Sequence, residues 1–121
     1  MPAKKKPRSK PFTQKRLISL FNHFNKTYFG GKCERPLHLR IGAIAKENLG
    51  EVTILAFGKG GTLIPVDLVI NKRLRWAPIL CSFVLLHEMA HLAAHELGHG
   101  VRFKQQVRRL LSNGAIARIF I

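Results

Sequence analysis

The feature that most constrains the fold of this chain is an HExxH pentapeptide at residues 87–91, which follows a long apolar run. The run begins at Pro78, a residue that suits the first turn of a helix, and residues 79–86 are apolar except for Ser82. This pattern predicts a core helix over about residues 78–97. The rest of the chain has to pack around it.

The two histidines of the pentapeptide predict a metal site. On a helix, His87 and His91 lie one turn apart on the same face, where both imidazoles can bind one Zn²⁺. Glu88 is rotated by about 100° from His87, so it is a poor third ligand but can reach a water molecule near the metal. It would act there as the general base. Without a ligand, each buried unpaired polar group would cost about 1–3 kcal/mol, which favours a zinc site over a chance pentapeptide.

The third zinc ligand has two candidates, His95 and His99. His95 lies about 12 Å beyond His87 along a helix axis and about 80° around it, so the three rings converge only if the helix breaks. We expect the break at Gly98, because glycine is favoured just after a helix C-terminus. A chain that reverses there brings His99 toward the metal. We therefore favour His99, with His95 as the alternative.

Two common classes of zinc peptidase do not fit the residues after the motif. The metzincin pattern requires glycine and histidine where this chain has Ala94 and Leu97. A thermolysin-like site requires a glutamate well downstream, and no acidic residue follows Glu96. Both classes are excluded.

The remaining patterns predict two further helices and a small sheet. Apolar residues at helical spacing predict a helix over about residues 13–29 with its aromatic side chains in the core. A last helix is expected over about residues 101–112. Strands are expected near residues 37–44, 51–57 and 65–70. The glycine-rich segment 58–61 does not match a phosphate-binding loop and is interpreted as a hairpin turn.

These elements predict an α+β fold in one small domain. An N-terminal helix, a three-stranded sheet, the HExxH helix and a closing helix make a minimal zincin-like domain over residues 12–121. Residues 1–11 combine basic residues and prolines with no acid, which predicts a disordered basic arm. Such an arm also suits a nuclear-import signal or a solubility tail.

The composition predicts an intracellular protein that does not associate with membranes, in the cytoplasm and nucleoid or in the nucleus. The longest apolar stretch, around residues 77–86, is far shorter than the ~20 residues that cross a bilayer. The charged N-terminus lacks the apolar region of a signal peptide. Cys33 and Cys81 are the only cysteines, too few for a disulfide framework.

The charge balance predicts a polyanionic partner, and nucleic acid fits best. The chain has 21 Lys+Arg against 6 Asp+Glu, a formal net charge of +15 and a pI of about 11.0. Trp76 lies beside one basic cluster and can stack on an unpaired base, although we favour core packing at the helix entrance. The candidate phosphate contacts lie in the arm, before the HExxH helix and in the last helix: Lys4, Lys5, Lys6, Arg8, Lys72, Arg73, Arg75, Arg102, Lys104, Arg108 and Arg109.

Three elements of the sequence together resemble the SprT-like (Spartan-type) family of zinc metalloproteases, which act on DNA–protein crosslinks. They are residues 28–32 (YFGGK), 87–91 (HEMAH) and 98–103 (GHGVRF). The resemblance covers most of residues 12–112 and implies that His99, in the Gly-His-Gly element, is the third zinc ligand. The segment between His91 and His99 is shorter than in the family, and the cysteine-rich zinc module of many members has no counterpart here.

The sequence is therefore consistent with two different functions. The first is a zinc-dependent protease that cleaves DNA-bound or DNA-crosslinked proteins and is held on DNA by its basic surface. The alternative is a basic nucleic-acid-binding protein with a structural zinc site and no peptidase activity. A structural site has no use for a carboxylate beside the metal, so Glu88 favours the protease. A membrane-surface protein is disfavoured, because the arm lacks an amphipathic anchor.

Overall fold

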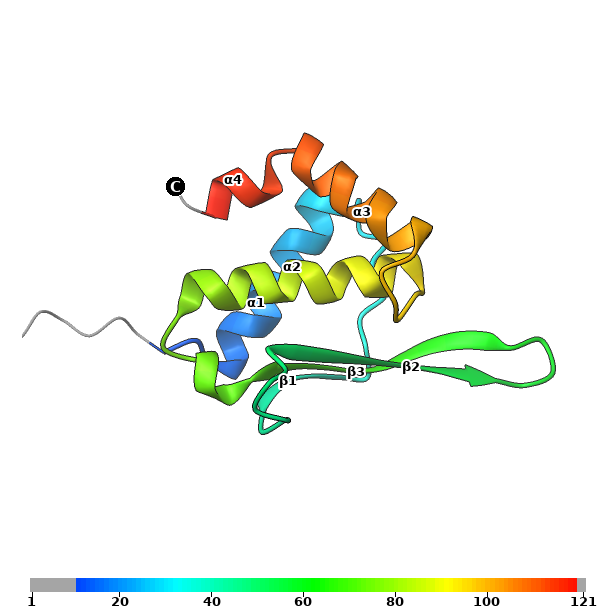
Figure 1. Ribbon diagram of the computed structural model, residues 1–121, viewed down its shortest axis with the longest axis horizontal. Coiled ribbons are helices and arrows are strands. Elements are labelled where there is room, and N and C mark those ends of the chain that lie inside the picture. The colour runs from blue at the N-terminus through cyan, green and yellow to red at the C-terminus, as the bar shows by residue number, and fades with distance from the viewer. Residues whose placement is uncertain (1–10, 120–121) are drawn as a thin grey trace, which may run out of the picture.

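The computed structural model describes residues 11–119, and within them the chain has four helices and a three-stranded mixed sheet (Figure 1). The predicted α+β class is confirmed. All of the predicted basic arm except Pro11 lies outside the described residues. The elements are α1 (Gln14–Tyr28), β1 (His38–Gly42), β2 (Gly50–Phe57), β3 (Thr62–Asn71), the 3-10 turn η1 (Lys72–Leu74), α2 (Pro78–Ala94), α3 (Val101–Ser112) and α4 (Ala115–Ile119).

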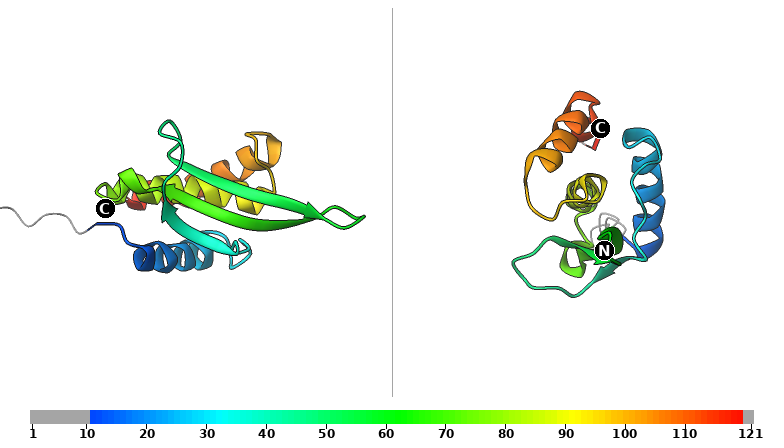
Figure 2. Two further views of the ribbon diagram at one scale, coloured as in Figure 1. Left: turned by 90° about the horizontal axis from the view of Figure 1, so that it is seen from below. Right: turned by 90° about the vertical axis from the view of Figure 1, so that its right-hand side faces the viewer.

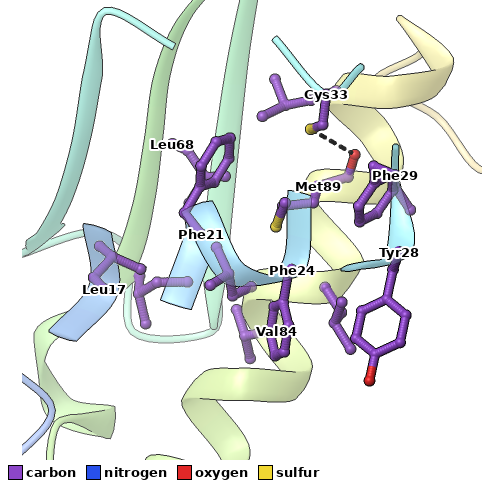
Figure 3. Packing of buried hydrophobic residues seen from close by; sticks show 14 of the residues in the cluster. Leu17, Phe21, Phe24, Tyr28, Phe29, Cys33, Leu68, Val84 and Met89 are labelled. Carbon is purple, nitrogen blue, oxygen red and sulfur yellow. Dashed lines mark hydrogen bonds between the residues drawn. The ribbon is translucent and has the colours of Figure 1, made fainter. Parts of the chain in front are cut away.

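Helix α1 forms where the sequence predicts a helix. The Thr13 side chain accepts a hydrogen bond of 3.2 Å from the Arg16 backbone N–H, which caps the N-terminus. After Tyr28 the chain reverses through Gly30 and Gly31, whose positive φ angles of 59° and 76° favour glycine. The aromatic side chains are in the core, as predicted (Figure 3), and the buried residues of this helix are Leu17, Phe21, Phe24 and Tyr28.

The sheet has the strand order β1-β3-β2, with β1 parallel and β2 antiparallel to β3. The segment 58–61 connects β2 and β3 as a hairpin turn, which confirms that prediction. Leu68 and Ile70 of β3 are fully buried against the helices. Because β3 is the central strand, β2 is an edge strand of this sheet. Its hairpin extends beyond the end of α2 (Figure 1).

Helix α2 occupies the centre of the fold, with the sheet, α1 and α3 around it (Figure 2). Buried residues lie on most sides of it, so the prediction of a core helix is confirmed. The Met89 carbonyl accepts a 3.7 Å hydrogen bond from Cys33 Sγ (Figure 3). Cys33 and Cys81 are both buried and unbridged, and burial raises their pKa to about 12 and about 11. Across residues 11–119, no helix is long and apolar enough to span a membrane.

Two details of the helices differ from the predictions. Helix α2 ends at Ala94 rather than near Leu97, so the expected break at Gly98 is wrong. The break occurs at His95, which adopts the left-handed conformation with φ 51° and ψ 43°. Helix α4 was not predicted, because its five residues are too few to show a hydrophobic period.

Candidate metal centre

The segment after α2 folds back immediately onto the helix. The His95 backbone N–H donates to the Leu92 carbonyl at 3.2 Å, and the Glu96 N–H donates to the His91 carbonyl at 3.1 Å. Both bonds satisfy carbonyl groups that the end of a helix leaves without partners. Because the reversal begins at residue 95, only a short segment separates the helix from His99. It returns His99 to the face of α2 that carries the HExxH histidines.

The structure brings His87, His91 and His99 together. Their ligand nitrogens all lie within 4.8 Å of one another, and the Nε2 atoms of His87 and His91 are 3.2 Å apart. Two nitrogens bound to one tetrahedral Zn²⁺ at about 2.0–2.1 Å are about 3.3 Å apart, so this spacing fits a shared metal. The cluster can hold a metal ion. His95 does not belong to it and is exposed, so the alternative third ligand has no support.

Neighbouring groups hold two of these rings in place. His91 Nδ1 lies 2.8 Å from the Glu96 carbonyl oxygen, and as a donor there it leaves Nε2 free to bind metal. The Phe103 ring stacks on His91 at 4.2 Å and lies 4.7 Å from His99. Arg102 Nε donates to Glu96 Oε2 at 3.3 Å, which ties the loop to α3. The third ligand position is therefore supported by the first turn of α3.

The surroundings of His87 and His91 favour the metal-binding form of these two histidines. Burial, together with the neighbouring His91 and His99, lowers the pKa of His87. Burial is also the main cause that lowers the pKa of His91. A lowered pKa keeps an imidazole neutral at physiological pH, and only the neutral ring binds a metal ion.

Glu88 lies beside the cluster without belonging to it. Its side chain is buried, and Oε1 is 4.0 Å from His87 Nε2. Burial raises the pKa of Glu88 to about 7, and the nearby carboxylate of Glu51 contributes to the rise. Two clefts, of about 340 Å³ and about 360 Å³, meet at His87 and Glu88. The carboxylate can therefore contact a water molecule or a substrate that enters either cleft.

At Gly50, strand β2 passes directly beside Glu88. The sequence patterns indicate this glycine only as a break between two strands. A Cβ on Gly50 would lie 2.7 Å from Val84 Cγ1 and 3.2 Å from Glu88 Cγ. Only glycine lets the strand approach α2 this closely. A glycine next to a predicted strand often indicates a close approach of the backbone to another element, and this was the one signal in the sequence.

The candidate phosphate contacts fall into two separate groups within the described residues, and those of the arm (Lys4, Lys5, Lys6 and Arg8) lie outside them. One exposed group is in and after η1 and consists of Lys72, Arg73 and Arg75. The second exposed group is on α3 and consists of Arg102, Lys104 and Arg108. Helix α2 lies between the two groups in the chain.

Arg109 and Trp76 differ from the predictions. Arg109 does not face outward: it donates to the Tyr28 carbonyl and to Gln106 Oε1, and its guanidinium lies 4.9 Å from the centre of the Phe29 ring. It satisfies a carbonyl at the end of α1. Trp76 is 52% exposed, so the favoured interpretation of core packing is wrong.

Comparison with known proteins identifies no relative of this chain: no family model, curated protein or solved structure matches it. The resemblance to SprT-like proteases rests on three sequence elements. Two of them, residues 87–91 and 98–103, supply the histidine cluster and the Phe103 ring that packs on it.

Proposed function

We propose that this protein is a zinc-dependent, SprT-like metallopeptidase that cleaves DNA-bound or DNA-crosslinked proteins. The observation that carries the proposal is the group of three histidines with a buried glutamate beside it and a cleft open to both. This is the donor set of a catalytic zinc site, which has three protein ligands and keeps one position for water or substrate. Its arrangement on the central helix and the following loop fits a zincin-like domain.

Each residue of the site has a role in peptide hydrolysis. His87, His91 and His99 would hold Zn²⁺ through neutral imidazole nitrogens, which suit this metal. Bound zinc supplies Lewis acidity, which polarises the scissile carbonyl and acidifies water. Glu88 takes a proton from the attacking water and passes it to the amine nitrogen as the peptide bond breaks. Without a metal, burial raises the pKa of Glu88 to about 7; bound zinc would lower it and so favour the carboxylate form that accepts the proton.

Strand β2 is the element best placed to orient a polypeptide substrate. It is an edge of the sheet, and its residues 50–52 line the same cleft as the three histidines. An extended substrate segment can add to such an edge through main-chain hydrogen bonds, which depend little on sequence. Tolerance of sequence is what a protease for many different DNA-bound proteins requires.

The charge of the chain supports the association with DNA. The formal net charge of +15 attracts a polyanion, and both exposed basic groups lie on elements next to helix α2 in the chain. An enzyme held on DNA meets proteins on the same DNA at a high effective concentration. Proteolysis would then be concentrated where the enzyme is bound.

The alternative of a structural zinc site in a DNA-binding protein is disfavoured by Glu88. Structural zinc sites have four protein ligands and no open position. Among the described residues the cluster has three members. Glu88 is buried beside them, and burial of a carboxylate costs folding free energy. A purely structural role gives no reason to retain that carboxylate.

The proposal is tested by incubating the zinc-loaded protein with a basic DNA-binding protein, with and without single-stranded DNA. Wild type should cleave it, and faster with DNA. Glu88→Gln should keep its zinc and lose about 10²-fold or more of the cleavage rate, because an amide cannot accept the proton. Glu34→Gln removes the same charge at an exposed position that lines neither cleft and is the matched control. Equal cleavage by Glu88→Gln and wild type would contradict the role of Glu88, and DNA binding without any cleavage would favour the alternative.

A further inference from the structure

Trp76 is an exposed aromatic side chain on an ordered turn. It is the only tryptophan of the chain and is 52% exposed, between η1 and the start of α2. The Asn71 side chain accepts a 3.1 Å hydrogen bond from the Arg73 N–H, and the Ala77 N–H donates to the Leu74 carbonyl at 2.8 Å. These bonds fix the backbone on both sides of the tryptophan. The ring is therefore presented to solvent by a defined turn.

Three cationic side chains lie close to Trp76 in the sequence, and one of them contacts its ring. Lys72, Arg73 and Arg75 are exposed, and among residues 11–119 none of them pairs with a carboxylate. The Arg75 guanidinium lies 5.6 Å from the centre of the Trp76 ring, and its Nη1 donates to the Lys72 carbonyl at 3.3 Å. The turn thus combines an aromatic face with positive charges that no carboxylate of the described fold neutralises.

The first residues that the structure describes lie at the same turn. The Phe12 backbone N–H donates to the Arg75 carbonyl at 2.6 Å, so the first described residues of the chain lie against residues 72–76. In the sequence, Phe12 follows closely after the basic residues Lys4, Lys5, Lys6, Arg8 and Lys10. The hydrogen bond therefore brings Phe12, the residue shortly after this basic segment in the sequence, to the backbone of the basic turn.

The turn lies at the start of the helix that carries the candidate metal centre. From Trp76 to Glu88 the chain advances by twelve residues, mostly along α2, a rise of about 18 Å. Leu80, in the first turn of α2, is 38% exposed and lines the cleft that reaches His87 and Glu88. A ligand on the turn would therefore lie at one end of the helix that carries the metal-binding motif.

We propose that residues 72–76 form a binding platform for single-stranded nucleic acid, in which a base stacks on Trp76 and phosphates pair with the three cations. Base–aromatic stacking combined with a basic surface is how proteins hold single strands without reading their sequence. A duplex keeps its base faces covered by stacking and cannot use the tryptophan in this way. The inference rests on the DNA association proposed above and adds the strand form and the surface that binds it.

The test uses Trp76 itself as the probe, since it is the only tryptophan. Fluorescent oligo(dT) of about 15 nucleotides is titrated with the protein, and both its anisotropy and the tryptophan emission are followed. Binding should quench the emission. Trp76→Ala should weaken binding about tenfold, in line with the loss of one stacked base, and Trp76→Phe should restore most of it. Phe57→Ala removes another aromatic, 50% exposed on β2, and should leave the affinity unchanged.

Different outcomes of this experiment test the Trp76 platform and the proposed association with DNA. Equal affinity of Trp76→Ala and wild type, or equal binding and quenching by a duplex of the same length, would overturn the platform while leaving DNA association in place. Quenching by poly-glutamate as strong as that by oligo(dT) would assign the turn to an acidic protein partner and would also overturn it. Oligo(U) in place of oligo(dT) should bind comparably, because stacking does not involve the sugar. No binding of any nucleic acid would contradict the DNA association itself.

Discussion

At the scale of single residues, Glu88 is the most unusual side chain of the fold. It is a carboxylate in a core helix, 6% exposed, with a pKa raised by burial to about 7. A buried charge of this kind is tolerated where a cation is bound next to it. The neighbouring cluster of neutral nitrogens offers the place for such a cation.

The raised pKa predicts how the zinc-free protein responds to pH. Between pH 4.5 and about 7 the folded chain keeps a proton on Glu88 that the unfolded chain has released. This bound proton stabilises the folded state, fully so below pH 4.5. As the pH rises from 4.5 through about 7, the free energy of unfolding falls by about 3 kcal/mol in total. Urea unfolding in EDTA at several pH values measures it as the difference between wild type and Glu88→Gln.

The lowered pKa values of His87 and His91 work in the opposite direction, since they remove stability as the pH falls below 6.5. They act in both proteins, so the difference between wild type and Glu88→Gln isolates the carboxyl group. Stability curves that run parallel for the two proteins would show that Glu88 is not buried as an acid.

The sequence predicts the positions of the HExxH residues but not those of two candidate nucleic-acid contacts, Arg109 and Trp76. The spacing of His87, Glu88 and His91 determines their geometry on any helix, so the motif alone predicts it. Arg109 and Trp76 depend on neighbours from other parts of the chain: Arg109 binds a carbonyl at the end of α1, and Trp76 lies on a turn that leaves its ring half exposed. No local pattern contains that information.

At the scale of secondary-structure elements, the contact between β2 and α2 shapes the site. Gly50→Ala should therefore disturb both stability and catalysis. The added methyl group would lie 2.7 Å from Val84 Cγ1, 3.2 Å from Glu88 Cγ and 3.2 Å from the Val69 carbonyl oxygen. We expect a loss of about 1–3 kcal/mol of stability, as for other overpacked sites, and slower peptide cleavage because Glu88 is displaced.

The matched control for this substitution is Gly60→Ala in the hairpin turn. A Cβ on Gly60 meets no atom within 4 Å, and its φ angle is not in the left-handed region. Thermal unfolding and cleavage rates of the two variants can be compared directly. If Gly50→Ala is as stable and as active as Gly60→Ala, β2 does not constrain the position of Glu88.

The boundaries of the helices show where prediction from sequence stops. Pro78 and the glycines at 30 and 31 are strong local signals, and α2 begins and α1 ends at or near these residues. The end of α2 has no such signal, because His95 adopts a conformation that non-glycine residues rarely take. The contacts of Glu96 with His91 and Arg102 accompany this early turn, and such contacts follow from the tertiary structure.

At the scale of the whole molecule, the basic residues act together through the field of a chain with net charge +15. Removing residues 1–10 should therefore weaken binding to DNA and reduce its salt dependence, by about 0.7–0.9 in the log–log slope for each phosphate that these residues neutralise. Zinc content should not change. Affinity measured over a series of salt concentrations gives the slopes of the full chain and of the truncated chain.

The same truncation separates binding from chemistry in the proteolytic assay. Cleavage of a DNA-bound protein should slow more than cleavage of a free peptide, because we expect the removed residues to raise the local substrate concentration and not to alter the chemistry. Equal slowing of both substrates, or binding that does not respond to salt, would contradict the link between the basic surface and proteolysis.

The central claim, that His87, His91 and His99 hold a catalytic zinc ion, is tested most directly by the metal content of purified variants. Wild type and His95→Ala should each contain about one zinc per chain, while His99→Ala should lose most of its zinc, because a catalytic site needs three protein ligands. His95 is the matched control, since it is an exposed histidine in the same loop and outside the cluster. Full retention of zinc by His99→Ala, or a greater loss in His95→Ala, would contradict the account.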